Sequence, residues 1–196
     1  MKFSAIAVFS AITGMVAATP QYRPTTTYPT VSNPWAPGYS SPVQPTGPKV
    51  TCLTTDTANT LIKGFASLLT NYNNATAGAL LASDFTDTSD SINQLAGYPI
   101  GSTTFPSKQA FQLGQGSQPK IDFTVLSVDE VTCTNVAFRW SAGVGKKLFP
   151  IKGINSFVAS NLNGTDQGWQ LKTMYSEFNS LGWFLNVGGQ IIPPSS

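Results

Sequence analysis

The amino-acid sequence changes character near residue 50, and this change sets how much of the chain can fold around a core. Residues 19–50 are rich in Pro, Thr, Ser and Tyr and carry no apolar repeat with the period of a helix or a strand. Frequent prolines interrupt backbone hydrogen bonding and favour extended chain. We therefore predict a disordered arm over residues 19–50, which is either a plain spacer or a region for O-glycosylation.

The first 18 residues have the three parts of a secretory signal peptide. Lys2 supplies a positive charge, an apolar run extends from Ala5 to Ala18, and small residues precede the expected cleavage point. The run is shorter than the ~20 apolar residues that cross a bilayer. We predict a signal peptide at 1–18 and a soluble, extracellular mature protein that begins at Thr19. The tail, residues 190–196, is too short for a lipid-anchor signal.

Residues 51–189 have the composition of one globular domain, long enough for a sizeable core. Its first helix is predicted from a cap at Thr54 or Thr55 to a stop near residues 71–74. The apolar stripe of that helix follows helical spacing: Ala58, Leu61, Ile62, Phe65, Leu68 and Leu69. Shorter helices are predicted at 76–82 and, behind a Ser107 cap, at 108–113.

The second half of the domain favours strands. Apolar and polar residues alternate or cluster over 121–128, 134–144, 149–160 and 169–178, and a turn signal at 163–166 separates the last two segments. The polar stretch 83–93 is predicted to be a loop or a short strand, and residues 97–106 are rich in turn formers. Helices followed by successive strands indicate an α+β fold with an antiparallel meander.

Two cysteines, Cys52 and Cys133, are the whole cysteine content of the chain. An even number in a secreted protein predicts a disulfide between them. They cannot form a zinc site by themselves, and the sequence contains no histidine to complete one.

The absence of histidine also excludes several classes of enzyme. Ser-His-Asp and Cys-His hydrolases, HExxH metalloproteases and His-ligated haem or copper sites all need it. Eleven Lys and Arg against nine Asp and Glu give a nearly balanced charge, which does not suit a nucleic-acid surface or a polybasic membrane anchor. We expect no metal, no cofactor, no nucleic acid and no membrane among the partners of this chain.

Four segments together resemble the nuclear transport factor 2-like superfamily, and more narrowly a secreted fungal branch of it. They are LLASDFTDTSDSIN (80–93), VAFRW (136–140), KGINSF (152–157) and WQLKTMYSEFNSLGWFLNVG (169–188). The resemblance implies a cone-like α+β fold in which helices pack on a curved antiparallel sheet, with a pocket between them. Members include isomerases, dehydratases, epoxide hydrolases, cyclases and plain binding domains, so the fold does not fix the function.

Acidic residues in the polar stretch are the candidates for acid/base chemistry. Asp84, Asp87 and Asp90 lie where some enzymes of the superfamily place a base, and Tyr98 could act as an oxyanion donor. The competing interpretation is a solvated loop whose Asp, Ser and Thr side chains bond their own backbone. We favour the solvated loop.

Charged and aromatic residues of the predicted strands are the candidates for a ligand pocket. Arg139 and Glu177 stand among apolar residues and could pair across the sheet. Alternation puts Glu177 on one face with Tyr175, Leu171 and Trp169. Together with Tyr98, three aromatic side chains either line a pocket or belong to the core: Trp140, Tyr175 and Trp183.

Two Asn-x-Ser/Thr sequons begin at Asn74 and Asn163, both in predicted turns, which favours N-glycosylation of a secreted chain. The leading functional hypothesis is a secreted, non-enzymatic binding domain for a small apolar ligand or for an extracellular, cell-wall or host partner. The alternative is a histidine-independent isomerase or epoxide hydrolase that uses Asp with Tyr or Arg. A pocket where a carboxylate meets Tyr or Arg would favour the enzyme.

Overall fold

The computed structural model describes residues 52–191 of the chain. The predicted signal peptide at 1–18, the predicted arm at 19–50 and the end of the tail lie outside the described residues. No helix in the described part is long and apolar enough to cross a membrane.

Helix α1 (Thr55–Thr70) confirms the first predicted helix. The Thr54 side chain accepts a hydrogen bond from the Thr57 N–H at 3.1 Å, which satisfies one of the free donors of the first turn. The predicted stripe is buried at Ala58, Leu61, Ile62, Phe65 and Leu68. Helix α1 therefore presents one continuous apolar face to the rest of the domain.

The region after α1 contains the short helix predicted at 76–82, two residues earlier than expected, and then differs from the prediction. Helix α2 (Asn74–Leu80) leads directly into strand β1 (Leu81–Thr88), and helix α3 (Asp90–Ala96) follows at once. Most of the stretch 83–93 is therefore regular structure, and only the short-strand alternative was correct in part. Ser89 separates the strand from the helix, because its side chain caps α3 by accepting from the Ile92 N–H at 3.0 Å. Helix α4 (Lys108–Gly116) has the predicted Ser107 cap.

Four strands form the predicted meander. Strands β2 (Asp122–Val131), β3 (Asn135–Gly143), β4 (Ile151–Asn161) and β5 (Trp169–Phe178) pair antiparallel in succession. Strand β1 joins the edge of β5 in parallel, which gives the order β1-β5-β4-β3-β2. The sheet is thus mixed rather than purely antiparallel. A short 3₁₀ turn (Asp166–Gly168) lies before β5, and helix α5 (Ser180–Asn186), which the sequence analysis did not assign, follows β5.

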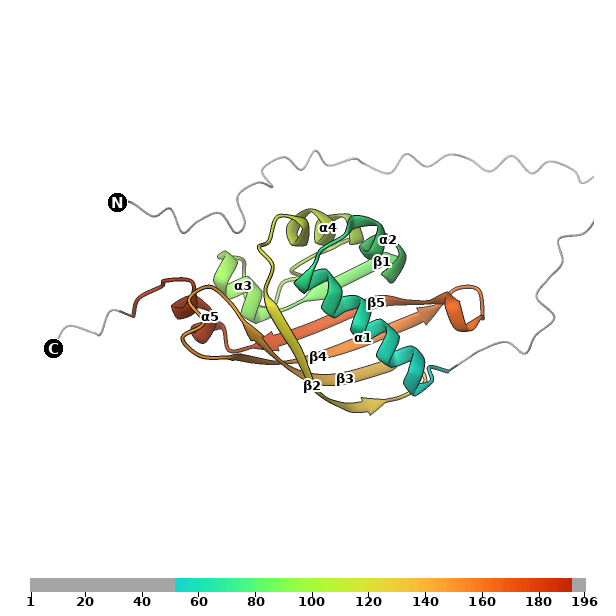
Figure 1. Cartoon of the computed structure of the whole chain (residues 1–196). Helices are drawn as coiled ribbons and strands as arrows, with labels where there is room; N and C mark the ends of the chain where they lie inside the picture. Colours follow the sequence, from blue (N-terminus) through green and yellow to red (C-terminus); the bar gives the residue numbers. More distant parts are fainter. Residues whose placement is uncertain (1–51, 192–196) are drawn as a thin grey trace, which may run out of the picture. The chain divides into compact units, whose positions relative to one another are not determined.

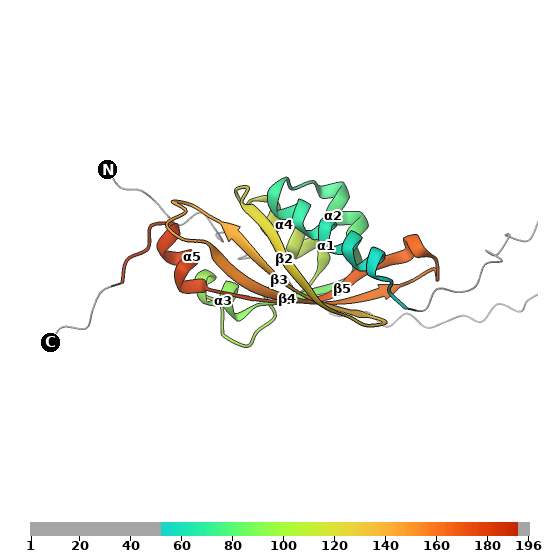
Figure 2. The ribbon, with the colours of Figure 1, turned by 60° about the horizontal axis from the view of Figure 1, so that its bottom comes forward.

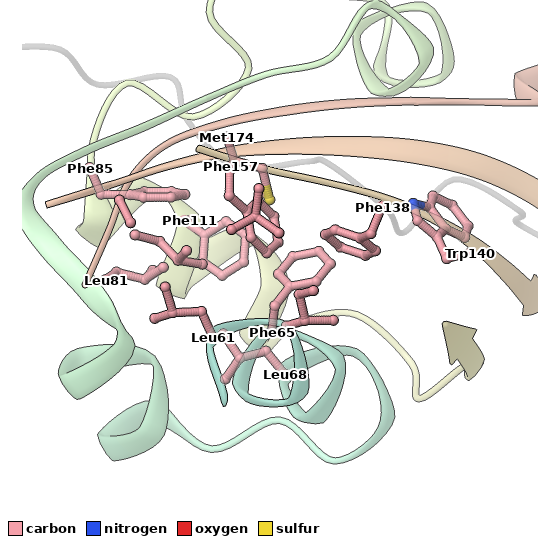
Figure 3. Close-up of a cluster of buried hydrophobic side chains, with 14 of the residues drawn as sticks. Leu61, Phe65, Leu68, Leu81, Phe85, Phe111, Phe138, Trp140, Phe157 and Met174 are labelled. Atoms are coloured by element: carbon pink, nitrogen blue, oxygen red, sulfur yellow. The ribbon is translucent and has the colours of Figure 1, made fainter. Parts of the chain in front are cut away.

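Helices α1, α2 and α4 cover one face of the sheet (Figures 1 and 2). Helices α3 and α5 lie together at one end of the sheet, where the Ser180 hydroxyl contacts the Gln94 side chain at 2.7 Å. In the core, Phe65 of α1 packs edge to face on Phe157 and Phe138 of the sheet, with ring centroids 5.2 and 6.5 Å apart (Figure 3). This aromatic core fixes the distance between α1 and the sheet.

A disulfide joins Cys52 to Cys133, as predicted. The bond ties Cys52, three residues before the start of α1, to the turn between β2 and β3. Beside it, the Leu53 N–H donates to the Cys133 carbonyl at 3.0 Å. The start of α1 is therefore held to the sheet by a covalent bond and a backbone hydrogen bond.

Candidate functional site

A cavity of about 110 Å³ lies between α1 and α4, the inner face of the sheet, and helices α3 and α5. Its walls are mostly aromatic and aliphatic. The lining residues are Phe65, Leu69, Asp87, Ile92, Leu95, Phe105, Phe111, Gln115, Gln118, Ile121, Phe123, Trp140, Met174, Ser176, Phe178 and Trp183. Asp87 is the single ionisable residue among them.

Asp87 is held by backbone bonds on both sides. Strand β1 pairs it with Met174 of β5, and on the other side its N–H donates to the Phe105 carbonyl at 2.9 Å while its own carbonyl accepts from the Thr104 N–H at 2.9 Å. The side chain is fully buried, and neither carboxyl oxygen has a hydrogen-bond partner. A buried polar group with no partner costs free energy, so this arrangement calls for an explanation.

Burial raises the pKa of Asp87 to about 8. Loss of solvent around the charged form is the main cause, and the negative charge of Glu177 adds to it. The nearby Thr88 backbone N–H works in the opposite direction, although it does not meet the geometry of a hydrogen bond to either oxygen. The carboxyl group of Asp87 is consequently protonated at neutral pH and is still able to ionise under mildly alkaline conditions.

Three further polar side chains lie on the inner face close to this wall. The Asn155 side chain is buried, and its Oδ1 accepts from the indole N–H of Trp140 and from the Ser176 hydroxyl, the latter at 3.1 Å. Nδ2 of Asn155 has no partner. These contacts fix the orientation of Trp140 and use the hydroxyl proton of Ser176, so the Ser176 oxygen can act toward a ligand only as an acceptor.

Glu177 lies on the opposite, outer face of β5. Its carboxylate accepts hydrogen bonds from the backbone N–H groups of Asp90 and Ser91 at 2.8 and 3.0 Å, and from the Ser91 hydroxyl. The first-turn N–H groups of a helix have no intrahelical partner, so Glu177 anchors the start of α3 to the sheet. Helix α3 in turn contributes Ile92 and Leu95 to the cavity.

The three candidate aspartates do not converge. Asp84 is exposed and forms an ion pair with Lys172 at 3.1 Å, and Asp90 accepts from the Gly101 N–H at 2.6 Å. Asp87 alone enters the cavity, which corrects the expectation that all of this stretch is solvated. Tyr98 is half-buried and does not line the cavity.

Two of the five pocket candidates line the cavity, namely Trp140 and Trp183. Arg139 points outward, as does Tyr175, which is half exposed. The hypothesis that Arg139 pairs with Glu177 is wrong: Arg139 binds Asp129 at 2.9 Å, and Ile154 of β4 stands between Arg139 and Glu177. The Arg139 guanidinium lowers the pKa of Asp129 through this contact.

Several cavity residues were not singled out from the sequence. The aromatic wall runs from Phe123 to Trp140, Phe178 and Trp183, with successive ring centroids 5.1, 5.8 and 5.2 Å apart. The sequence pattern that could have identified part of the wall is the alternation of Met174, Ser176 and Phe178. These three residues lie on one face of β5, with a polar residue between two apolar ones.

Within residues 52–191, no group of three metal-ligating side chains is close enough to hold an ion. Of the two sequons, Asn74 begins α2 and Asn163 lies in the β4–β5 connection, and both residues are exposed. Glycosylation at these positions stays a prediction.

A profile of the NTF2-like domain matches residues 51–190. The chain belongs to the NTF2-like family. This match confirms the resemblance to the NTF2-like superfamily that the sequence motifs indicated. It does not distinguish a secreted fungal branch within that superfamily. A search of curated proteins finds no match to this chain.

Solved structures share the fold of this NTF2-like domain at low sequence identity. An NTF2-like protein of unknown function from Burkholderia pseudomallei has a TM-score of 0.53 and 11% identity, over 68% of this chain and 98% of that one. IdmH from Streptomyces antibioticus, proposed to be a polyketide cyclase, has a TM-score of 0.51 and 15% identity, over 67% and 98%. A ketosteroid isomerase-like protein from Catenulispora acidiphila, solved with trimethylamine, has a TM-score of 0.50 and 12% identity, over 68% and 97%. At such identities these structures establish the fold alone.

Proposed function

We propose that this NTF2-like domain binds a small, mostly apolar molecule in the cavity and holds its polar group against Asp87. The observation that carries the proposal is the fully buried Asp87 carboxyl group with no partner in an otherwise apolar cavity. Binding sites of small molecules have this composition, with apolar walls and a few polar groups that orient the ligand. A ligand with one polar atom at Asp87 would remove the cost of the unpaired carboxyl group.

Catalysis by acid/base chemistry is a second candidate, favoured by the raised pKa of Asp87. A base works best when its pKa lies near the operating pH. The cavity contains no Tyr or Arg among its described lining residues, so an oxyanion donor has to come from elsewhere. If the natural protein turns over an enolisable ketone and Asp87→Asn abolishes this turnover, the enzyme is favoured. If no turnover is measured, binding is the function that the site supports better.

We also propose that the protein is secreted. The signal-peptide pattern of residues 1–18 supports this, and the Cys52–Cys133 disulfide fits an oxidising compartment. A cell-wall or host partner is a further prediction that rests on the extracellular location.

The binding proposal predicts that benzyl alcohol, a small neutral probe with one polar atom, enters the cavity. Titration should shift the indole N–H signals of Trp140 and Trp183 in a ¹H-¹⁵N NMR spectrum, because both rings line the cavity. Leu95→Trp should weaken binding at least tenfold by filling the cavity from α3. Leu113→Trp on the exposed side of α4 is the matched control and should bind within twofold of the natural protein. Absence of shifts, or equal binding by the filled variant, would show that the cavity is not a ligand site.

A further inference from the structure

When Asp87 is ionised, the polar atoms that face the cavity are mainly hydrogen-bond acceptors. The two Asp87 oxygens have no donor, and Ser176 has already committed its hydroxyl proton to Asn155. The Gln115 side chain donates through Nε2 to the Leu68 carbonyl at 3.3 Å, which leaves its Oε1 as a further acceptor beside the second N–H of Nε2. A ligand that offers N–H donors therefore complements this wall better than a ligand that offers only acceptors.

The charged groups near the cavity also favour a ligand that donates hydrogen bonds, because they favour a cation. No Lys or Arg lines the described cavity, and the charged neighbour that acts on Asp87 is Glu177, which is also acidic. The Glu177 carboxylate favours a positive charge at the cavity, and so does Asp87 once it ionises. A cation beside Asp87 would offset the repulsion from Glu177 and supply the donor that the Asp87 oxygens lack.

The opposite walls suit the rest of such a ligand. Trp140, Phe178 and Trp183 form consecutive ring contacts, and the hydrogen bond from the Trp140 indole to Asn155 holds the first ring in place. Aromatic rings attract cations through their electron-rich faces and accept apolar groups equally well. The volume of about 110 Å³ is smaller than the ~150 Å³ of a cavity that holds benzene, so the enclosed part of a ligand has to be compact. The cavity is partly open to solvent, so a benzyl group can extend into its mouth.

We propose that the ligand of this cavity is a small organic amine, bound as the ammonium ion with its N–H groups on the Asp87 carboxylate and its apolar part among the aromatic rings. This inference rests on the proposed binding function and names the ligand class for the same cavity. It goes beyond an apolar ligand in general, because it makes positive charge the property that the cavity selects.

The test compares benzylamine with benzyl alcohol, which have the same shape and differ in the charge of the polar group. Both are titrated by NMR at pH 8.5, above the pKa of Asp87, into the natural protein and two variants. The natural protein should bind benzylammonium at least tenfold more tightly than benzyl alcohol. Asp87→Asn, which keeps the shape but removes the charge, should reduce this preference to twofold or less.

Asp84→Asn is the matched control, because it removes a carboxylate from the same strand at an exposed position outside the cavity. It should retain the preference for benzylammonium. The amine inference is overturned if benzyl alcohol binds as tightly as benzylammonium, or if Asp87→Asn keeps the full preference. In both cases the proposed binding function survives, whereas binding of neither probe would contradict that function itself.

Discussion

Asp87 is an acid whose carboxyl group is out of contact with water and has no protein partner. At the residue scale this explains why it behaves differently from Asp84 and Asp90, which are close to it in sequence. Asp84 has an exposed ion pair with Lys172, and Asp90 has a backbone donor from the loop. Burial, and not position in the sequence, is therefore what raises the pKa of Asp87.

The raised pKa of Asp87 predicts how stability depends on pH. The folded state holds the proton up to about pH 8, whereas the unfolded chain releases it near pH 4, so the folded state binds more protons between these values. The free energy of unfolding should then fall as pH rises across this window, by up to about 1.4 kcal/mol per pH unit. Glu177 on β5 is the charged group that acts on Asp87, and its charge adds to the penalty.

The Asp87→Asn variant should lack this contribution. Urea unfolding at pH 5, 6.5 and 8 should show that the variant gains stability relative to the natural protein as pH rises, by several kcal/mol over the range. Asp84→Asn serves as the comparison and should follow the natural protein. Parallel curves for the natural protein and Asp87→Asn would mean that Asp87 titrates normally.

At the scale of the elements, a bulge in β5 decides which side chains face the cavity. Thr173 pairs with Val158 and Leu171 pairs with Ala159, so Lys172 is an extra residue in the strand. Trp169 and Leu171 are buried before the bulge, and Met174, Ser176 and Phe178 face inward after it. Strict alternation had placed Tyr175 and Glu177 with Trp169 and Leu171, and the bulge makes that prediction wrong.

Helix α3 depends on the same strand. It has only seven residues, too few to be stable alone, and its first N–H groups are satisfied by Glu177 of β5. We predict that Glu177→Ala destabilises the domain by about 1–2 kcal/mol, as loss of a helix cap does. Urea unfolding measures the change, and Glu130→Ala, at an exposed position of edge strand β2, is the control.

Removal of the Glu177 side chain, which anchors α3, should also change the cavity, since α3 supplies Ile92 and Leu95 to its wall. Binding of benzyl alcohol to Glu177→Ala should weaken along with stability. An alanine variant as stable as the natural protein would show that α3 is held mainly by its packing.

At the scale of the whole molecule, the disulfide closes a loop that contains α1 to β2. Cys52 and Cys133 are 81 positions apart, and closing a loop of this size stabilises a fold by about 4 kcal/mol in the chain-entropy model. The disulfide also supports the proposal that the protein is secreted, because disulfides form and persist in oxidising compartments.

Protein collected from the medium of producing cells should therefore begin at Thr19 and contain no titratable thiol when unfolded without a reductant. N-terminal sequencing and a thiol assay in denaturant check both statements. Retention of Met1 would contradict cleavage of the signal peptide, and two titratable thiols would contradict the disulfide in the secreted protein.

The sequence by itself determined α1, the four meander strands and the disulfide. Each depends on a local pattern: a helical stripe with a Thr54 cap, alternation along the strands, and two cysteines in a chain that is predicted to be secreted. These patterns can be recognised without the tertiary contacts, because α1 is long and the strands alternate regularly. The same patterns supported the membership of the NTF2-like superfamily.

Only the tertiary structure decided the parallel pairing of β1, helices α3 and α5, and the cavity. Helices of seven residues depend on partners far along the chain, as α3 does on Glu177. The burial of Asp87 likewise depends on β5 and on the segment at Phe105, which close around it from opposite sides. A local pattern predicts which residues can face inward. Which segments then pack around such a residue and exclude water from it depends on contacts across the whole domain.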